Sequence, residues 1–359
     1  MDQWEKIMVK PERTTSWKQT IGYWAFILLL IPPCFEAALW LLQYRPYVQE
    51  AYSIHAEPSH CLIHHPQLGF ALNPGHYLVT MNEGLRYHVT HGEDSLRITA
   101  NRPLPDSLPM IYLMGCSYTY GMGVDDSLSF PYLLQQELRN VQVKNLGVPG
   151  FGTVQSLLQL RQRIKAGEHP ALVMLNYADF HEGRNVLSPG FRHALSVGYQ
   201  QSDESVNEAM GKSRVPYAEL PLGKLRLRSC PWDSLYQDWR YRDALASVNF
   251  FQSLSDDIHL HQLEPQAVTL ALCQEMKALC DSVGVPFLVT GLTQTSQTQT
   301  TLHQLQEAGI STLDISVDLR DPRFNNAPFD SHPNALAHQH YARKVGEWTS
   351  SWVCDGAGR

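Results

Sequence analysis

The sequence lacks any long run of lysine and arginine, and its formal net charge is −7. Proteins that bind nucleic acid neutralise phosphates with clustered basic side chains, so we predict no nucleic-acid partner. The seven cysteines contain no CxxC pair. A metal site built from His332, His338 and His340 is disfavoured, because 338 and 340 fall on different faces of a helix. We therefore predict neither a metal nor an organic cofactor.

Long apolar runs are also scarce, with one exception near the start. Residues 21–42 read IGYWAFILLLIPPCFEAALWLL, which is long enough to cross a bilayer and holds a single acidic residue, Glu36. Arg45 is the only lysine or arginine between this run and Arg86, whereas four precede it, Lys6, Lys10, Arg13 and Lys18. The positive-inside rule then predicts a cytoplasmic tail at 1–19, a signal anchor at 20–43 and an exported remainder. The alternatives are a cleaved signal peptide, for which no clean cleavage site follows, and a buried soluble helix.

The exported part divides into two regions. Residues 44–107 form a juxtamembrane segment with short strands expected at 77–81 and 86–90. From 108 to 359 apolar strands alternate with helices, which predicts an α/β domain of three layers, α/β/α, around a five-stranded, mainly parallel sheet. The strands are expected at 110–114, 141–145, 172–175, 286–290 and 312–315, and the helices near 127–139, 153–165, 266–283 and 335–352.

The alternation stops at about 188–263, which we interpret as an insertion that lies over the active edge as a lid or subsite. It contains an aromatic run, Trp232, Tyr236, Trp239 and Tyr241. Such side chains either stack on sugar rings or pack in the core of the insertion, and the pattern leaves both open.

Candidate catalytic residues follow the strands, because function in an open parallel sheet gathers at the carboxyl ends of its strands. Ser117 stands in a Gly-Cys-Ser turn after the first strand, where a nucleophile would have backbone N–H donors nearby. A glycine-containing turn, Asn145 to Gly150, follows the second strand. Before the last helix, Asp330 can orient the ring of His332 and leave its other nitrogen as a base. Taken singly, Ser117 could merely cap a turn, and His332 could be structural.

The order of these three blocks resembles the SGNH/GDSL hydrolase family across roughly residues 110–353. The resemblance implies the flavodoxin-like fold of that family, with Ser117 as nucleophile, His332 as general base and Asp330 as its orienting acid. It also implies an oxyanion hole built from the N–H groups of Ser117 and Gly150.

Three departures accompany the resemblance. Cys116 replaces the usual Asp beside the nucleophile, and Asp330 lies one place closer to the histidine than is common. The third departure concerns Ala178, which occupies the place of the family's oxyanion-binding Asn. Asn176, Asp179 and His181 are the nearby candidates for a substitute oxyanion donor or a substrate contact. Losing one such donor typically costs about 10²- to 10³-fold in rate.

The resemblance and the predicted topology imply a membrane-anchored serine esterase outside the cytoplasm, in a location such as the periplasm. Its expected substrates are small-molecule or polysaccharide esters, in particular O-acetyl groups of carbohydrates. Two alternatives remain: an O-acyltransferase with the same mechanism, and a catalytically weak domain for polysaccharide binding or assembly. Ala178 favours the binding domain, whereas Ser117, His332 and Asp330 favour an enzyme. Hydrolysis of phospholipid is a third, weaker possibility.

Overall fold

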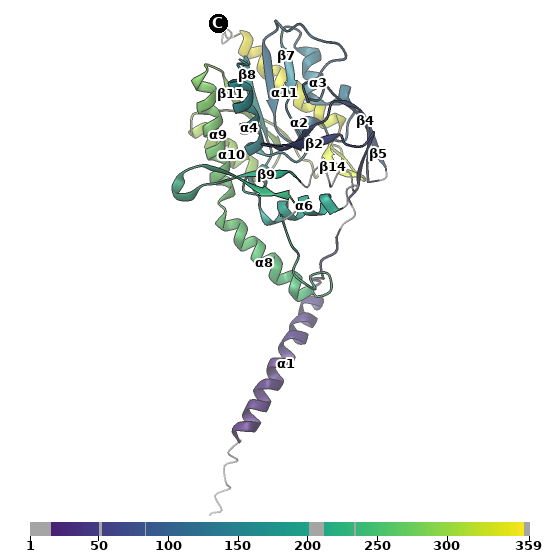
Figure 1. Ribbon diagram of the computed structural model, residues 1–359, viewed down its shortest axis with the longest axis vertical. Coiled ribbons are helices and arrows are strands. Elements are labelled where there is room, and N and C mark those ends of the chain that lie inside the picture. The colour runs from purple at the N-terminus through teal and green to yellow at the C-terminus, as the bar shows by residue number, and fades with distance from the viewer. Residues whose placement is uncertain (1–15, 50–51, 83, 201–211, 233–234, 355–359) are drawn as a thin grey trace, which may run out of the picture. The chain divides into compact units, whose positions relative to one another are not determined.

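A computed structural model describes residues 16–49, 52–82, 84–200, 212–232 and 235–354 (Figure 1). The described residues form two compact units. The small unit comprises residues up to 49 together with 238–255, and the large unit comprises the rest. Each unit is described by itself.

The large unit is built on a sheet of five parallel strands in the order β12-β11-β8-β6-β7. Every residue of the central strands β8 and β11 is buried, as expected for strands covered on both faces. The predicted five-stranded sheet is confirmed. In chain order its strands are β6 (Met110–Met114), β7 (Gln142–Asn145), β8 (Leu172–Tyr177), β11 (Phe287–Thr293) and β12 (Ser311–Val317).

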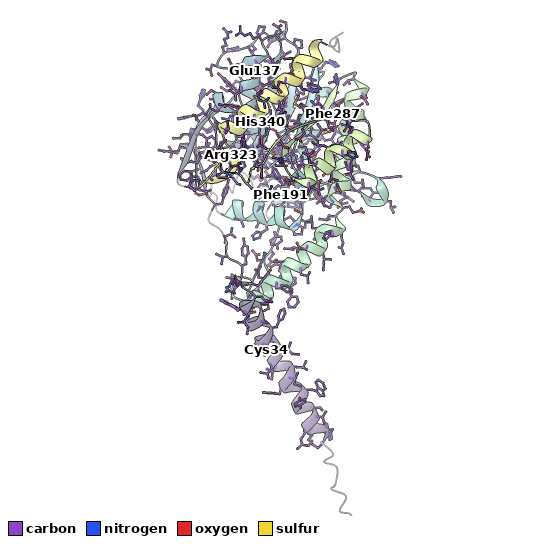
Figure 2. All side chains as sticks on the ribbon, turned by 180° about the vertical axis from the view of Figure 1, so that it is seen from behind. Cys34, Glu137, Phe191, Phe287, Arg323 and His340 are labelled. Carbon is purple, nitrogen blue, oxygen red and sulfur yellow. The ribbon has the colours of Figure 1, made fainter. Side chains whose placement is uncertain are left out.

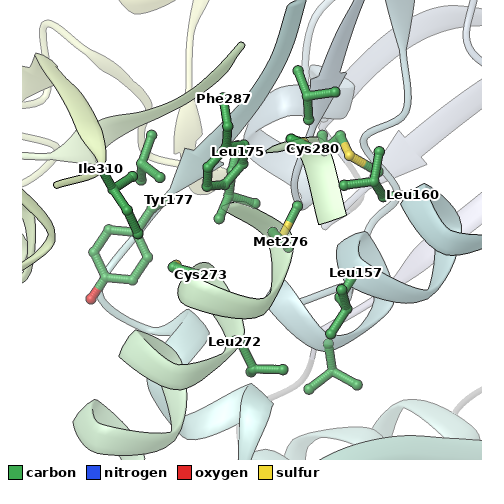
Figure 3. Close-up of a cluster of buried hydrophobic side chains, with 14 of the residues drawn as sticks. Leu157, Leu160, Leu175, Tyr177, Leu272, Cys273, Met276, Cys280, Phe287 and Ile310 are labelled. Carbon is green, nitrogen blue, oxygen red and sulfur yellow. The ribbon is translucent and has the colours of Figure 1, made fainter. Parts of the chain in front are cut away.

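Helices cover both faces of this sheet. On one face α3 (Phe130–Glu137) and α11 (Ala335–Cys354) share a hydrophobic cluster with β6 and β8. On the other face lie α4 (Thr153–Lys165), α9 (Pro265–Ser282) and α10 (Ser296–Glu307). Figure 3 shows this second cluster, in which Leu157 and Leu160 of α4 approach Leu272 and Met276 of α9 beneath the sheet. The three-layer α/β/α class is therefore confirmed.

The sequence pattern gave no signal for α10. Its buried side chains include two threonines, Thr298 and Thr301, beside Leu302 and Leu305. Half of that buried stripe is polar, so hydropathy alone does not reveal the helical period.

From residue 52 onward, the described part of the segment predicted at 44–107 belongs to the large unit. Its strands β1 (Ile54–Glu57), β4 (Gly75–Met81) and β5 (Leu85–His91) form an antiparallel sheet, and β2 (Leu62–His65) pairs with β3 (Gly69–Leu72). Buried side chains of these strands join one cluster with Tyr120, Val148 and Phe151, which follow strands of the central sheet. Residues 52–91 therefore share a core with the domain that carries the candidate site.

In the stretch interpreted as an insertion, the described residues include α6 (Pro189–Gln200), a hairpin of β9 (Arg214–Glu219) and β10 (Arg226–Pro231), and α8 (Ala246–Gln262). The first ten residues of α8 belong to the small unit. Its aromatic run divides accordingly. Trp232 is buried in the large unit's core against Phe70, whereas Trp239 and Tyr241 are exposed side chains of the small unit.

The small unit contains α1 (Trp17–Leu41). A capping box formed by Ser16 and Gln19 lies at the beginning of this helix. The helix is long and apolar enough to cross a membrane. Its side chains stand outward along its length in Figure 2, where Cys34 is labelled. Pro32 and Pro33 lie inside it.

Candidate active site

Ser117 is the first residue of the short helix α2 (Ser117–Tyr120), directly beyond β6. The turn between them requires glycine at 115, whose φ is +156°. A Cβ at that position would lie 2.9 Å from the carbonyl oxygen of Asn176. This close approach of two backbones holds Ser117 at the carboxyl end of the sheet.

His332 and Asp330 lie on the short strand β14 (Asp330–Pro333), which pairs with β13 (Asn325–Asn326) just before α11. The hydroxyl of Ser117 lies 3.0 Å from Nε2 of His332, and Nδ1 of His332 lies 2.6 Å from Oδ1 of Asp330. The backbone N–H of His332 donates to the same carboxylate oxygen at 2.7 Å. The carboxylate assigns the ring proton to Nδ1, so that Nε2 is free to accept the proton of Ser117.

The carboxylate of Asp330 is held in its charged form. Burial alone would raise its pKa, but hydrogen bonds from His332 and from Tyr52 outweigh burial, and the net pKa is below the ordinary value. The Tyr52 hydroxyl donates to Oδ2 at 3.2 Å. Desolvation of the phenol and the neighbouring Asp330 charge raise the pKa of Tyr52, which keeps that hydroxyl a donor.

The family resemblance names two backbone N–H groups as oxyanion donors, those of Ser117 and Gly150. Within the described part of the chain, neither the N–H of Ser117 nor that of Gly150 donates to a protein acceptor. Gly150 adopts a φ of +83° in the loop after β7. That loop is anchored by Asn145, which accepts from the N–H of Gly147 at 3.0 Å and donates to the carbonyl of Tyr120. These free donors are what a developing oxyanion would require.

A nucleophile after the first strand, a glycine loop after the second and an Asp-x-His strand before the last helix meet at the carboxyl edge of one parallel sheet. The five-stranded parallel sheet with helices on both faces is consistent with the SGNH α/β fold.

Solved structures with a related fold include proteins described as lipolytic members of the G-D-S-L family. One from Veillonella parvula is 10% identical, with a TM-score of 0.34, and the match covers 67% of this chain and 97% of that one. Another, from Desulfitobacterium hafniense, is 14% identical, with a TM-score of 0.31 and coverages of 66% and 98%. A family two carbohydrate esterase from Clostridium thermocellum is 8% identical, with a TM-score of 0.36 and coverages of 72% and 67%. No family model matches the chain, and no curated protein sequence matches it.

Ala178, which occupies the place of the oxyanion-binding asparagine of SGNH hydrolases, directly follows β8 and is fully buried. The amide of Asn176 donates to the carbonyl of Met114 and accepts from the Thr290 hydroxyl, so it is used between strands of the sheet. Asp179 accepts hydrogen bonds from the N–H of Phe180 and from the Thr293 hydroxyl.

His181 differs from these residues because both of its ring nitrogens are buried without a partner in the described structure. Its ring packs edge-on against Tyr177 and Phe180. Burial, with a smaller contribution from Arg184, lowers its pKa well below the ordinary value, so the imidazole is neutral.

Two further side chains belong to this site. Tyr52, which precedes β1, reaches Asp330 through its hydroxyl. Arg184, on α5 (His181–Asn185), donates to the carbonyl of Phe151 at 2.9 Å and stacks over the Phe180 ring at 4.3 Å. No carboxylate pairs with Arg184 among the described residues. Burial lowers the pKa of its guanidinium, and the nearby Cys116 and Tyr118 oppose that effect. Neither residue stands in a motif that the sequence alone would single out.

Cys116, the residue in place of the family's Asp, is fully buried. Burial raises the pKa of its thiol, and its neighbours only partly offset that effect. The thiol is therefore a protonated packing group beside the nucleophile.

Proposed function

We propose that this protein is a serine esterase anchored in a membrane by α1, with its site outside the cytoplasm, and that it removes O-acyl groups from carbohydrates. The observation that carries the proposal is the unbroken hydrogen-bonded chain from Ser117 through His332 to Asp330. A binding domain would need neither of these two contacts, so the geometry favours an enzyme.

The proposed reaction begins when Oγ of Ser117 attacks the ester carbonyl carbon and its proton passes to Nε2 of His332. The N–H groups of Ser117 and Gly150 would stabilise the tetrahedral oxyanion. Collapse breaks the bond to the sugar oxygen, which takes the proton from His332 and leaves as the alcohol. Water then attacks the acyl-serine, giving its proton to His332. The second collapse returns that proton to Ser117 and releases the acid.

Two features support the finer assignment. The basic residues ahead of α1 favour export of the chain that follows it. The site would then lie outside the cytoplasm, where envelope and exported glycans are found. The SGNH resemblance supports esters of sugars as substrates. Acetyl is the acyl group we propose, with a polysaccharide or a smaller glycan as its carrier.

The full chain in nanodiscs tests the proposal. We expect it to hydrolyse p-nitrophenyl acetate and to release acetate from an acetylated polysaccharide. Both activities should be lost in Ser117→Ala and in His332→Ala and retained in Ser311→Ala, which changes an exposed serine of β12. A fluorophosphonate probe should label Ser117. An unlabelled, inactive wild type would refute the esterase assignment.

The acyltransferase alternative gives a different result in the same assay. There the fluorophosphonate labels Ser117, hydrolysis by water is slow, and added sugar acceptors become acetylated. Product analysis by mass spectrometry distinguishes acetylated acceptor from free acetate.

A further inference from the structure

The small unit contains a feature that the esterase chemistry does not use. Residues 238–255, which follow α1 by about 200 positions in the chain, fold back against the carboxyl-terminal part of that helix. The carboxylate of Glu36 accepts hydrogen bonds from the N–H of Ala246 at 2.7 Å and of Ser247 at 2.9 Å, at the beginning of α8. An acid within an otherwise apolar span thus satisfies the free N–H groups of a second helix.

Aromatic and backbone contacts strengthen this attachment. The Phe35 ring stacks on Phe251 with a centroid distance of 5.5 Å and meets Phe250 edge-on at 5.9 Å. The side chain of Asn249 donates to the carbonyl of Arg45 at 2.9 Å. The start of α8 is therefore fixed to a defined level along α1.

That level can be estimated from helix geometry. At 1.5 Å per residue the 25 residues of α1 extend about 37 Å, which exceeds the roughly 30 Å of a hydrocarbon core, so its ends reach the headgroups. Glu36 precedes Leu41 by five residues, or about 8 Å. It therefore lies close to the boundary between hydrocarbon and headgroups, and so does the beginning of α8.

The side chains that the returning segment exposes suit that environment. From 244 to 255 the sequence ALASVNFFQSLS has no ionisable side chain. Its exposed apolar side chains include Leu245, Phe251 and Leu254. They add to the exposed apolar side chains at the carboxyl end of α1. The loop before α8 adds Trp239 and Tyr241, with Arg240 stacked 4.8 Å from the Tyr241 ring. Tryptophan, tyrosine and arginine are residues that membrane interfaces favour.

We propose that residues 239–254 form a second membrane contact, lying in the headgroup region of the leaflet into which the carboxyl end of α1 emerges. The occupant of this apolar face is lipid, because the face is continuous with a helix that is itself apolar on every side and is fixed at the level of the interface. The proposal rests on α1 crossing the bilayer and is independent of the esterase activity.

Photo-crosslinking of the full chain in phosphatidylethanolamine–phosphatidylglycerol vesicles tests this contact. Benzoylphenylalanine is introduced in place of Phe251, Leu254, Leu28 or Leu336. Leu336, on α11, is the matched control, since its exposed fraction of 49% equals that of Phe251. We expect phospholipid adducts at 251 and 254, as at Leu28 in the span, and none at 336.

Adducts at Leu28 without adducts at 251 and 254 would overturn the proposal, and adducts of 251 to a protein would assign the face to a protein partner instead. No adduct at Leu28 would overturn the premise that α1 spans the bilayer. Esterase activity, measured on the same samples, reports on the catalytic proposal separately.

A second measurement needs only conservative changes. Lipids with a nitroxide on the headgroup should quench part of the tryptophan emission, and Trp239→Phe should remove a portion of that quenching. Trp232→Phe, which changes a buried indole of the large unit, should leave it unchanged. Equal effects of the two substitutions would contradict an interfacial position for 239.

Discussion

Replacing Asp330 by asparagine is expected to lower kcat steeply while leaving KM nearly unchanged. One carboxylate oxygen accepts both the ring N–H of His332 at 2.6 Å and its backbone N–H at 2.7 Å, and the carboxyl side chain is only 3% exposed. The neutral amide still fits, but it no longer fixes the proton on Nδ1 or stabilises the imidazolium. The corresponding change in serine proteases costs about 10⁴-fold, so we expect 10³- to 10⁴-fold, or about 4–5.5 kcal/mol of transition-state stabilisation.

Steady-state hydrolysis of p-nitrophenyl acetate measures this loss, and the rate of fluorophosphonate labelling of Ser117 checks it independently. Asp318→Asn is the control, because its carboxylate pairs with Arg320 at the surface and forms no hydrogen bond with Ser117, His332 or Asp330. Thermal unfolding of both variants excludes a folding defect. A kcat for Asp330→Asn within tenfold of wild type would refute the assigned role of Asp330.

Three other predictions concern the side chains of Tyr52, His91 and Arg184. Tyr52→Phe removes a hydrogen bond to the charged form of Asp330, so the pKa of Asp330 should rise, and the pH at which protonation of Asp330 abolishes kcat/KM should rise with it. Burial lowers the pKa of His91 from 6.5 to about 4. Because the unfolded chain takes up that proton first, the free energy of unfolding should fall by up to about 3 kcal/mol as pH drops from 6.5 to 4. His91→Gln should flatten this dependence in urea unfolding at the two pH values, and an unchanged slope would contradict it. Arg184→Lys gives up the guanidinium N–H that donates to the Phe151 carbonyl, so kcat should fall by roughly tenfold at constant KM. A rise in KM alone would instead indicate a role in substrate binding.

The strands of the central sheet could be predicted because they are short apolar runs buried on both faces. Leu172 to Leu175 is the clearest example, since no polar residue interrupts it. The helix α10 could not be predicted, because threonines occupy half of its buried stripe. The contact between α8 and α1 could not be predicted either, because a single carboxylate at Glu36 gives no sequence signal for a partner 210 positions away.

The residues of the candidate site also divide into those that could be predicted from the sequence and those that could not. Ser117, Asp330 and His332 could be proposed together because parallel strands bring their carboxyl ends to one edge, whatever the distance along the chain. The structure places these three side chains in hydrogen-bond contact. Tyr52 and Arg184 could not be proposed, because each acts through one long-range contact rather than a local pattern.

The Tyr52 contact has a consequence for where the chain can be shortened without altering the chemistry of the site. The phenol lies between α1 and the first strand of the large unit, outside any strand or helix. A truncated form that begins at the first strand, Ile54, would keep Ser117, His332 and Asp330 but would lose the hydroxyl that helps to keep Asp330 ionised. We expect such a form to have the pH profile of Tyr52→Phe rather than that of the full chain. The functional boundary of the large unit therefore lies before its first strand, at a single side chain.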